Sequence, residues 1–168
     1  MPARGAPIRL AGGLLMAAAP SFRLATARDL PRIVRLLAAD PLGAQRECAD
    51  EPLAPSYSAA FAAIESDPHN ELLVADVEGT VAGVLQLTYL PSLTYRGSWR
   101  AQIEGVRVDP ALRGRGIGRA LLAEACERAR RRGCRLVQLT TDRQRPDAIA
   151  FYEELGFRPT HVGMKLTL

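Results

Sequence analysis

The sequence has few of the residues that metal sites, disulfide frameworks and hydrolase triads require. Its 168 residues include three cysteines and two histidines. Cys48, Cys126 and Cys134 are odd in number and lack the spacing of disulfide or zinc pairs, so we expect no metal site and a reducing, cytoplasmic location. Neither His69 nor His161 has a nucleophile and an acid nearby, which argues against a Ser-His or Cys-His hydrolase.

Long apolar runs are also missing, and none reaches the ~20 residues that a membrane-spanning helix needs. The first twenty residues, MPARGAPIRLAGGLLMAAAP, have a basic start and an apolar stretch from Leu10 to Ala19, so they imitate a short signal peptide. Met16 offers an alternative start. We expect residues 1–20 to be a disordered or miscalled extension, and residues 21–168 to form one domain.

Lysine is nearly absent, because Lys165 stands alone beside 21 arginines. A GC-rich genome would explain this preference for arginine over lysine as well as a functional role for the arginines would. The arginines are unevenly placed: residues 107–145 hold eleven of them against four acidic residues, whereas residues 40–80 hold nine acidic residues against Arg46 alone. One half of the chain should therefore attract anions and the other half cations.

The apolar pattern alternates between strand-like and helix-like segments and predicts a mixed α+β (α/β) fold class. Thr26 and Asp29 form a cap-like pair before the first helix, and Glu78 to Thr80 supply a hairpin turn. Strands are expected at 21–25, 71–77, 81–90, 99–108, 135–140 and 161–168. Helices are expected at 30–37, around Tyr57 to Ile64, at 117–132 and at 146–155, with an irregular connection at 41–55.

The segment DPALRGRGIG, residues 109–118, joins a strand-like run to a helix-like one. Gly114, Gly116 and Gly118 permit positive φ and the close approach of another group, while the following helix directs free N–H groups at the loop. Flanking arginines favour a multiply phosphorylated ligand, and a plain glycine turn leaves them unexplained. A nucleotide-hydrolase loop would need Gly-Lys-Ser/Thr, and a dinucleotide fingerprint would need a small residue at Arg119.

The pattern R-x-x-G-x-G at residues 113–118, behind the strand IEGVRVDP, resembles the acyl-CoA loop of the GCN5-related N-acetyltransferase (GNAT) superfamily. AQIEGVRVDPALRGRGIGRALL and RPDAIAFYEELGF are similar to the family's loop and late helix in order and spacing, and the resemblance extends from Ser21 to the C-terminus. It implies a mostly antiparallel, splayed central sheet flanked by helices, and acetyl-CoA as cosubstrate. The cofactor-binding residues that it implies are Val106, Arg107, Val108, Arg113, Gly114, Arg115, Gly116, Ile117, Gly118, Arg119, Asp147 and Phe151.

The alternation of the strand at 99–108 breaks around Gly105, which predicts a β-bulge there. In the superfamily a splayed strand at this place opens a slot for the thioester arm of the coenzyme. The resemblance implies that main-chain groups of Val106 and Val108 contact this arm. It also implies that a backbone N–H near Val106 meets the oxyanion.

Acetyl transfer to an amine requires an uncharged nitrogen, a stabilised oxyanion and a proton for the departing thiolate. The resemblance implies that Glu104 is the general base, acting directly or through water, and that Tyr152 protonates the thiolate. Two alternatives stay open. Glu104 can be a strand-edge carboxylate paired with Arg100 or Arg107, and Tyr152 can simply pack in an aromatic cluster.

The sequence departs from the family at Arg145, where many relatives have asparagine seven residues before the tyrosine. This variant resembles the branch that contains aminoalkylphosphonate acetyltransferases. Glu47, Asp50 and Glu51 are either the edge of an acceptor site for a cationic amine or a solvated loop.

The sequence therefore predicts an acyltransferase that moves an acetyl group from acetyl-CoA to a primary amine of a small molecule, by direct attack in a ternary complex. A non-catalytic acyl-CoA-binding regulatory module and acetylation of a protein or peptide amine are the alternatives. We expect no membrane and no nucleic acid as partner, because the arginines at 128–135 lack interleaved aromatics and suit a helix C-terminus. A homodimer is common among the proteins that the chain resembles.

Overall fold

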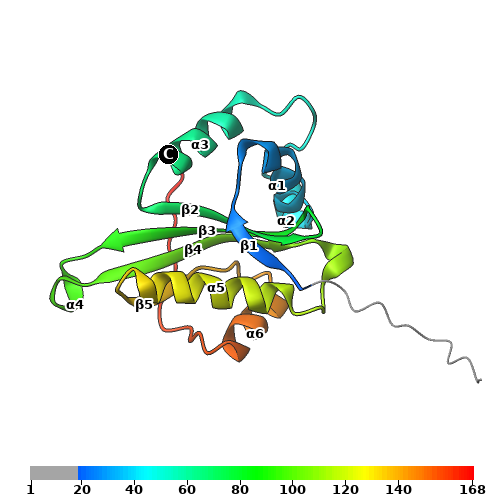
Figure 1. The fold of residues 1–168 in the computed structure, drawn as a ribbon. Helices are drawn as coiled ribbons and strands as arrows, with labels where there is room; N and C mark the ends of the chain where they lie inside the picture. Colours follow the sequence, from blue (N-terminus) through cyan, green and yellow to red (C-terminus); the bar gives the residue numbers. More distant parts are fainter. Residues whose placement is uncertain (1–18) are drawn as a thin grey trace, which may run out of the picture.

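A five-stranded sheet forms the centre of the computed structural model, which describes residues 19–168 (Figure 1). The strand order is β1-β2-β3-β4-β5, and only the last pair, β4 and β5, is parallel. The mixed α+β fold class expected from the sequence is confirmed. The strands are β1 (Ser21–Leu24), β2 (Asn70–Val77), β3 (Thr80–Pro91), β4 (Trp99–Val108) and β5 (Cys134–Leu139).

Helices cover both faces of the sheet, with α1 and α3 on one side and α5 and α6 on the other (Figure 1). Each face has its own apolar core, because adjacent strand residues point to opposite faces. Val84 belongs to the core under α1 and α3, and Leu85 to the core under α5. The helices are η1 (Ala27–Asp29), α1 (Leu30–Leu37), α2 (Pro41–Ala44), α3 (Pro55–Ser66), α4 (Thr94–Gly97), η2 (Pro110–Leu112), α5 (Ile117–Arg131) and α6 (Pro146–Glu154).

A glycine in the left-handed conformation lies at each end of α5. Gly116 has φ 79° before the helix and Gly133 has φ 78° after it. Leu121, Ala125 and Ala129 form a buried stripe between them, as their spacing predicts. The helix therefore has a defined start, a defined end and one face fixed against the sheet.

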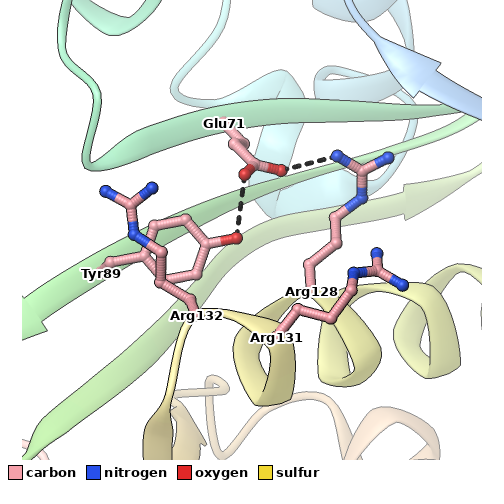
Figure 2. Close-up of a pocket in the computed structure, with 5 residues that line it drawn as sticks. All are labelled: Glu71, Tyr89, Arg128, Arg131 and Arg132. Carbon is pink, nitrogen blue, oxygen red and sulfur yellow. Dashed lines mark hydrogen bonds and ion pairs between the residues drawn. The ribbon is translucent and has the colours of Figure 1, made fainter.

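A polar network fixes the last turn of α5 to β2 and β3 (Figure 2). The Arg128 guanidinium donates to one Glu71 oxygen at 2.9 Å, and the Tyr89 hydroxyl donates to the other at 2.9 Å. The Arg132 guanidinium lies 4.9 Å from the centre of the Tyr89 ring. Burial and the neighbouring Glu71 carboxylate raise the pKa of Tyr89. The network satisfies the polar groups of buried Tyr89 and of the mostly buried Glu71 and Arg128 side chains, and sets the position of the helix end.

β4 contains the bulge that the sequence predicts. The pairing register shifts between Val84 and Gln86 of β3, so β4 has one residue more than β3 at this point, around Gly105 and Val106. Gly105 has φ 61°. On its other side, β4 pairs with β5 only as far as Ile103. β5 ends at Leu139, opposite Ile103, so β4 continues through the bulge without a strand on that side among residues 19–168.

Residues 161–168 do not form the strand that their alternation predicts. All eight are exposed, and none takes part in a backbone hydrogen bond with the rest of residues 19–168. The segment meets the end of β5 at one point, since a Cβ on Gly163 would lie 3.8 Å from Thr140 Cγ2. It then runs across the strand direction (Figure 1). A strand needs a partner alongside it, and an alternating sequence does not supply one.

Two other segments differ from the expectations or lie outside what the structure shows. The connection at 41–55 contains one helical turn, α2, capped by the Asp40 carboxylate, which accepts from the Gly43 N–H at 2.7 Å. The expected N-terminal extension, residues 1–20, lies outside the described residues except for its last two. Between residues 19 and 168, no helix has both the length and the apolar character needed to cross a membrane.

Candidate active site

The loop between β4 and α5 contains the glycines that the sequence singled out. Gly114 and Gly116 have φ of 75° and 79°, a conformation that residues with side chains rarely adopt. A Cβ at either position would have no heavy atom within 4 Å, so neither glycine is required by internal packing. Glycine at these two positions sets the path of the chain and leaves the surface of the loop accessible to a ligand.

The backbone of this loop has unused hydrogen-bond donors. In the described part of the chain, no acceptor pairs with the N–H groups of residues 113–119. The N-terminus of α5 adds a partial positive charge, and together these features suit a phosphate-bearing ligand. Arg113 and Arg115 are exposed, whereas the Arg119 guanidinium forms an ion pair with Glu154 at 3.1 Å.

Gly118 differs from the other two glycines because it lies in close packing. A Cβ at this position would lie 3.4 Å from Phe151 Cζ and 3.4 Å from Val108 Cγ2. The first turn of α5 therefore approaches both β4 and α6. This contact brings together three of the residues expected to bind the coenzyme, and Ile117 beside them is buried.

Residues 104–108 of β4 form an unpaired strand edge next to the loop. The last pair between β4 and β5 is Ile103 with Leu139, so beyond it the β5 side of β4 has no strand partner within residues 19–168. An extended ligand can pair with such an edge as a strand would. Val106 and Val108 pack against the core under α5, and the Val106 carbonyl accepts from the Arg107 guanidinium at 2.8 Å.

Tyr152 lies on α6 and packs between two aromatic rings. The centre of its ring is 5.4 Å from that of Phe151 and 5.9 Å from that of Phe157. Burial raises the pKa of Tyr152, although the charges of Arg107 and Arg145 act in the opposite direction. The phenol therefore stays protonated at neutral pH, and no hydrogen bond inside residues 19–168 occupies its hydroxyl. Packing and proton donation, the two interpretations of the sequence, are compatible here.

An ionic cluster that the sequence did not predict lies close enough to Tyr152 for its charges to act on the hydroxyl. The Arg145 guanidinium donates to Asp40 Oδ1 at 2.8 Å, and Arg107 Nε lies 3.3 Å from Asp40 Oδ2. Burial, followed by the charge of Arg145, lowers the pKa of Arg107. The Asp40 carboxylate therefore pairs with two guanidinium groups at once. Asp40 and Arg145 are 105 positions apart, and no local sequence pattern links them.

Glu104 is exposed and directly follows Ile103, the last residue of β4 that pairs with β5. It follows Ile103, whose side chain belongs to the core under α5, so the Glu104 side chain points to the opposite face, the one that carries α1 and α3. The alternative ion pairs with Arg100 and Arg107 do not form: the Arg100 Nε has no partner among residues 19–168, and Arg107 lies against Asp40.

Other acidic residues lie around this group: the charge of Glu47 acts on Arg107, and the charge of Arg145 acts on Asp142. Asp147, which the sequence suggested as a coenzyme contact, is exposed in the first turn of α6. Glu47 accepts from the Tyr57 hydroxyl at 2.8 Å, and Glu51 accepts from the Arg35 guanidinium at 2.8 Å. Both carboxylates therefore hold their own loop in place, which favours the structural interpretation of this acidic segment.

Solved structures include one with a closely similar backbone and sequence. A crystal structure named as a transcriptional regulator from Bacillus halodurans C-125 has a TM-score of 0.87 and 52% sequence identity with this chain. The match covers 89% of this chain and 99% of that one. The fold and its boundaries are therefore shared almost completely with that protein.

Curated relatives include two N-acetyltransferases. Aminoalkylphosphonate N-acetyltransferase from Salmonella typhimurium is 34% identical over 106 residues, which are 63% of this chain and 68% of that protein. Glucosamine 6-phosphate N-acetyltransferase from Trypanosoma brucei brucei is 39% identical over 90 residues, 54% of this chain and 59% of that protein's length. These matches support the acyltransferase class expected from the sequence. A sequence profile described as "Acetyltransferase (GNAT) family" matches residues 32–157, and the chain belongs to this family.

Proposed function

We propose that the protein transfers an acetyl group from acetyl-CoA to a primary amine of a small molecule. The observation that carries this proposal is the loop at 113–119, where unpaired N–H groups and positive-φ glycines lie directly beside the free edge of β4. The loop suits the diphosphate of coenzyme A, and residues 106–108 suit its extended arm. We place the reaction in a reducing, cytoplasmic compartment, supported by the free thiols of Cys48, Cys126 and Cys134.

In the proposed reaction acetyl-CoA supplies the acetyl thioester. The neutral amine attacks the thioester carbon directly, and the C–N bond forms as the C–S bond breaks. A backbone N–H near Val106 stabilises the negative charge that develops on the carbonyl oxygen. Tyr152 gives its proton to the leaving sulfur, and Glu104 takes the proton that the amine loses, directly or through water.

A panel of amines tests this function. The whole protein would be mixed with acetyl-CoA and with aminophosphonates, amino sugars, polyamines, amino acids and short peptides, and free thiol would be measured. Release of thiol that depends on one small amine, with the N-acetyl product seen by mass spectrometry, supports the proposal. Turnover confined to peptides would instead identify a peptide acetyltransferase.

We expect the Glu104→Gln substitution to lower kcat/KM by roughly tenfold at neutral pH, since the amine then loses its proton to solvent alone. The effect should shrink as pH rises toward the pKa of the amine, because the neutral amine becomes abundant without a base. Glu65→Gln is the matched control: it removes an exposed carboxylate on α3, outside the site. Equal rates for the two variants would remove Glu104 from the mechanism.

The ionic cluster favours an acceptor that carries an acidic group as well as its amine. Arg107 and Arg145 share the Asp40 carboxylate, and the charges of both act on the hydroxyl of Tyr152. Guanidinium groups bind phosphate, phosphonate and carboxylate oxygens through paired hydrogen bonds. The two curated relatives named above act on a sugar phosphate and on phosphonates, which supports the same choice here.

Arg145→Gln should raise KM for an aminophosphonate by roughly tenfold, about 1.4 kcal/mol, while KM for an uncharged amine changes little. The control is Arg46→Gln, which breaks the 3.5 Å ion pair with Asp142 that links the same two parts of the chain. If the two variants change KM for acidic and neutral amines alike, the cluster only holds the loops together.

A non-catalytic acyl-CoA-binding module is the second candidate, and one observation favours it. The structure that is 52% identical to this chain is named as a transcriptional regulator. Such a module would be stabilised against heat by acetyl-CoA and would release no thiol with any amine. Catalytic turnover would exclude it, whichever amine proves to be the acceptor.

A further inference from the structure

The Asp40 carboxylate contacts three segments, namely the start of α2, β4 and the start of α6. Its Oδ1 accepts from the Gly43 N–H at 2.7 Å and from the Arg145 guanidinium at 2.8 Å. Its Oδ2 forms an ion pair with Arg107, whose Nε lies 3.3 Å away. The side chains of Asp40, Arg107 and Arg145 are 20%, 17% and 22% exposed, so water and salt screen these interactions only in part.

The position of Asp40 is set by the turn that follows it. Gly43 packs so closely against the end of α1 that a Cβ there would lie 2.0 Å from the Leu37 carbonyl oxygen. Together with the cap on α2, this contact leaves the Asp40 side chain little freedom. The carboxylate is therefore a fixed point from which other groups can be held.

One interaction of Asp40 reaches the bulge of β4. Among residues 19–168, the segment 104–108 has a strand partner on the β3 side only. The Arg107 guanidinium donates to the Val106 carbonyl at 2.8 Å while its Nε side faces Asp40. Held in this way, the Arg107 side chain restrains the peptide groups around Val106, where the proposed reaction places the N–H that meets the oxyanion.

A second interaction reaches α6, a helix with no fully buried residue. Arg145 directly precedes α6, and its carbonyl accepts from the N–H groups of Ala148 and Ile149, both at 3.1 Å. The backbone of Arg145 is therefore part of the first turn, while its side chain is tied to Asp40. Tyr152 follows about two turns later on the same helix, so the tie limits the movement of its hydroxyl.

We propose that Asp40 is a positioning residue for acetyl transfer, which holds the β4 bulge and the start of α6 at a fixed separation. The oxyanion donor near Val106 and the Tyr152 hydroxyl then meet the same thioester; this inference rests on the proposed function. α1 and α2 lie on one face of the sheet and α6 on the other, so the bond from Asp40 to Arg145 joins the two helical layers (Figure 1). An error of about 1 Å in the spacing of reacting groups costs up to roughly 100-fold in rate.

Asp40→Ser tests the proposal, because serine still caps α2 and is too short to reach either guanidinium. We expect kcat for an uncharged amine to fall by roughly tenfold or more, with the affinity for coenzyme A nearly unchanged. Asp29→Ser is the matched control: Asp29 directly precedes α1, accepts from the Arg23 guanidinium at 2.7 and 3.0 Å, and has a side chain that is 12% exposed. Both variants should lose thermal stability, but only Asp40→Ser should lose kcat.

A double-mutant cycle with Tyr152→Phe separates positioning from support of the fold. If Asp40 acts through the placement of the Tyr152 hydroxyl, Asp40→Ser should cost at least about threefold less in kcat when that hydroxyl is already absent. Additive effects would contradict the proposal. So would equal kcat for Asp40→Ser and Asp29→Ser, which would leave the proposed function standing.

Hydrogen exchange decides the matter even if no amine is acetylated, an outcome that would refute the proposed function alone. Amides of residues 105–107 and of residues 147–152 should exchange faster in Asp40→Ser than in Asp29→Ser. The global stability of each variant, measured by denaturant unfolding, corrects for a general loosening of the fold. Unchanged exchange in either segment would show that Asp40 does not hold it, and would overturn the proposal.

Discussion

Replacing Tyr152 with phenylalanine is expected to lower kcat by roughly 100-fold, while the affinity for coenzyme A stays nearly unchanged. The ring keeps its contacts with Phe151 and Phe157, so only the hydroxyl is lost. Without that proton the sulfur must leave as a thiolate, and the C–S bond breaks more slowly. Steady-state kinetics with a saturating amine would measure kcat, and calorimetry with coenzyme A would measure the affinity.

Tyr89→Phe is the control for this variant, because it removes the hydroxyl of a buried tyrosine whose hydrogen bond goes to Glu71, at the other end of α5. We expect it to reduce thermal stability and to leave kcat intact. The pH profile adds an independent readout. Burial raises the pKa of Tyr152, so the protonated phenol, and with it kcat, should persist to a pH above the ordinary tyrosine value of about 10. Unchanged kcat in Tyr152→Phe would assign the residue to packing alone.

Gly116→Ala should weaken coenzyme A binding by roughly 100-fold, about 2.7 kcal/mol. Gly116 has φ 79°, where a Cβ is strained, and relief of that strain turns the N–H groups of the loop away from their common direction. Each N–H to phosphate hydrogen bond is charge-assisted, so the loss of one or two accounts for this magnitude. Isothermal titration with coenzyme A measures it directly.

Gly133→Ala controls for strain without touching the site. Gly133 has φ 78°, and a Cβ added there would have no heavy atom within 4 Å, as at Gly116. It differs from Gly116 in its place, because it follows the C-terminus of the same helix. Both variants should lose similar thermal stability, about 1–2 kcal/mol, and only Gly116→Ala should lose affinity. Equal affinities in the two would show that the loop does not hold the diphosphate.

The parts of the fold that the sequence predicts are those set by neighbouring residues. The turn at Glu78 and Gly79 forms because both take positive φ, and the bulge forms where the alternation of β4 breaks at Gly105. The loop at 113–118 was recognisable because its glycines act through their own backbone. In each case the determining interactions lie within about ten positions along the chain.

The parts that escaped the sequence depend on distant partners. Asp40 and Arg145 are 105 positions apart, so the ionic cluster beside Tyr152 has no signal in any local pattern. The segment at 161–168 shows the opposite error. Its alternation predicts a strand, and that prediction is wrong, because among residues 19–168 no strand lies alongside it.

The anchoring of α5 has a consequence for how inactive variants should be interpreted. Glu71 and Arg128 fix this helix roughly 17 Å along its axis from the glycines that point its N–H groups outward. A rigid rod held at its far end transmits any tilt to its tip. Random mutagenesis scored by loss of turnover would therefore mark two separate patches on the surface, of which only one touches the reactants.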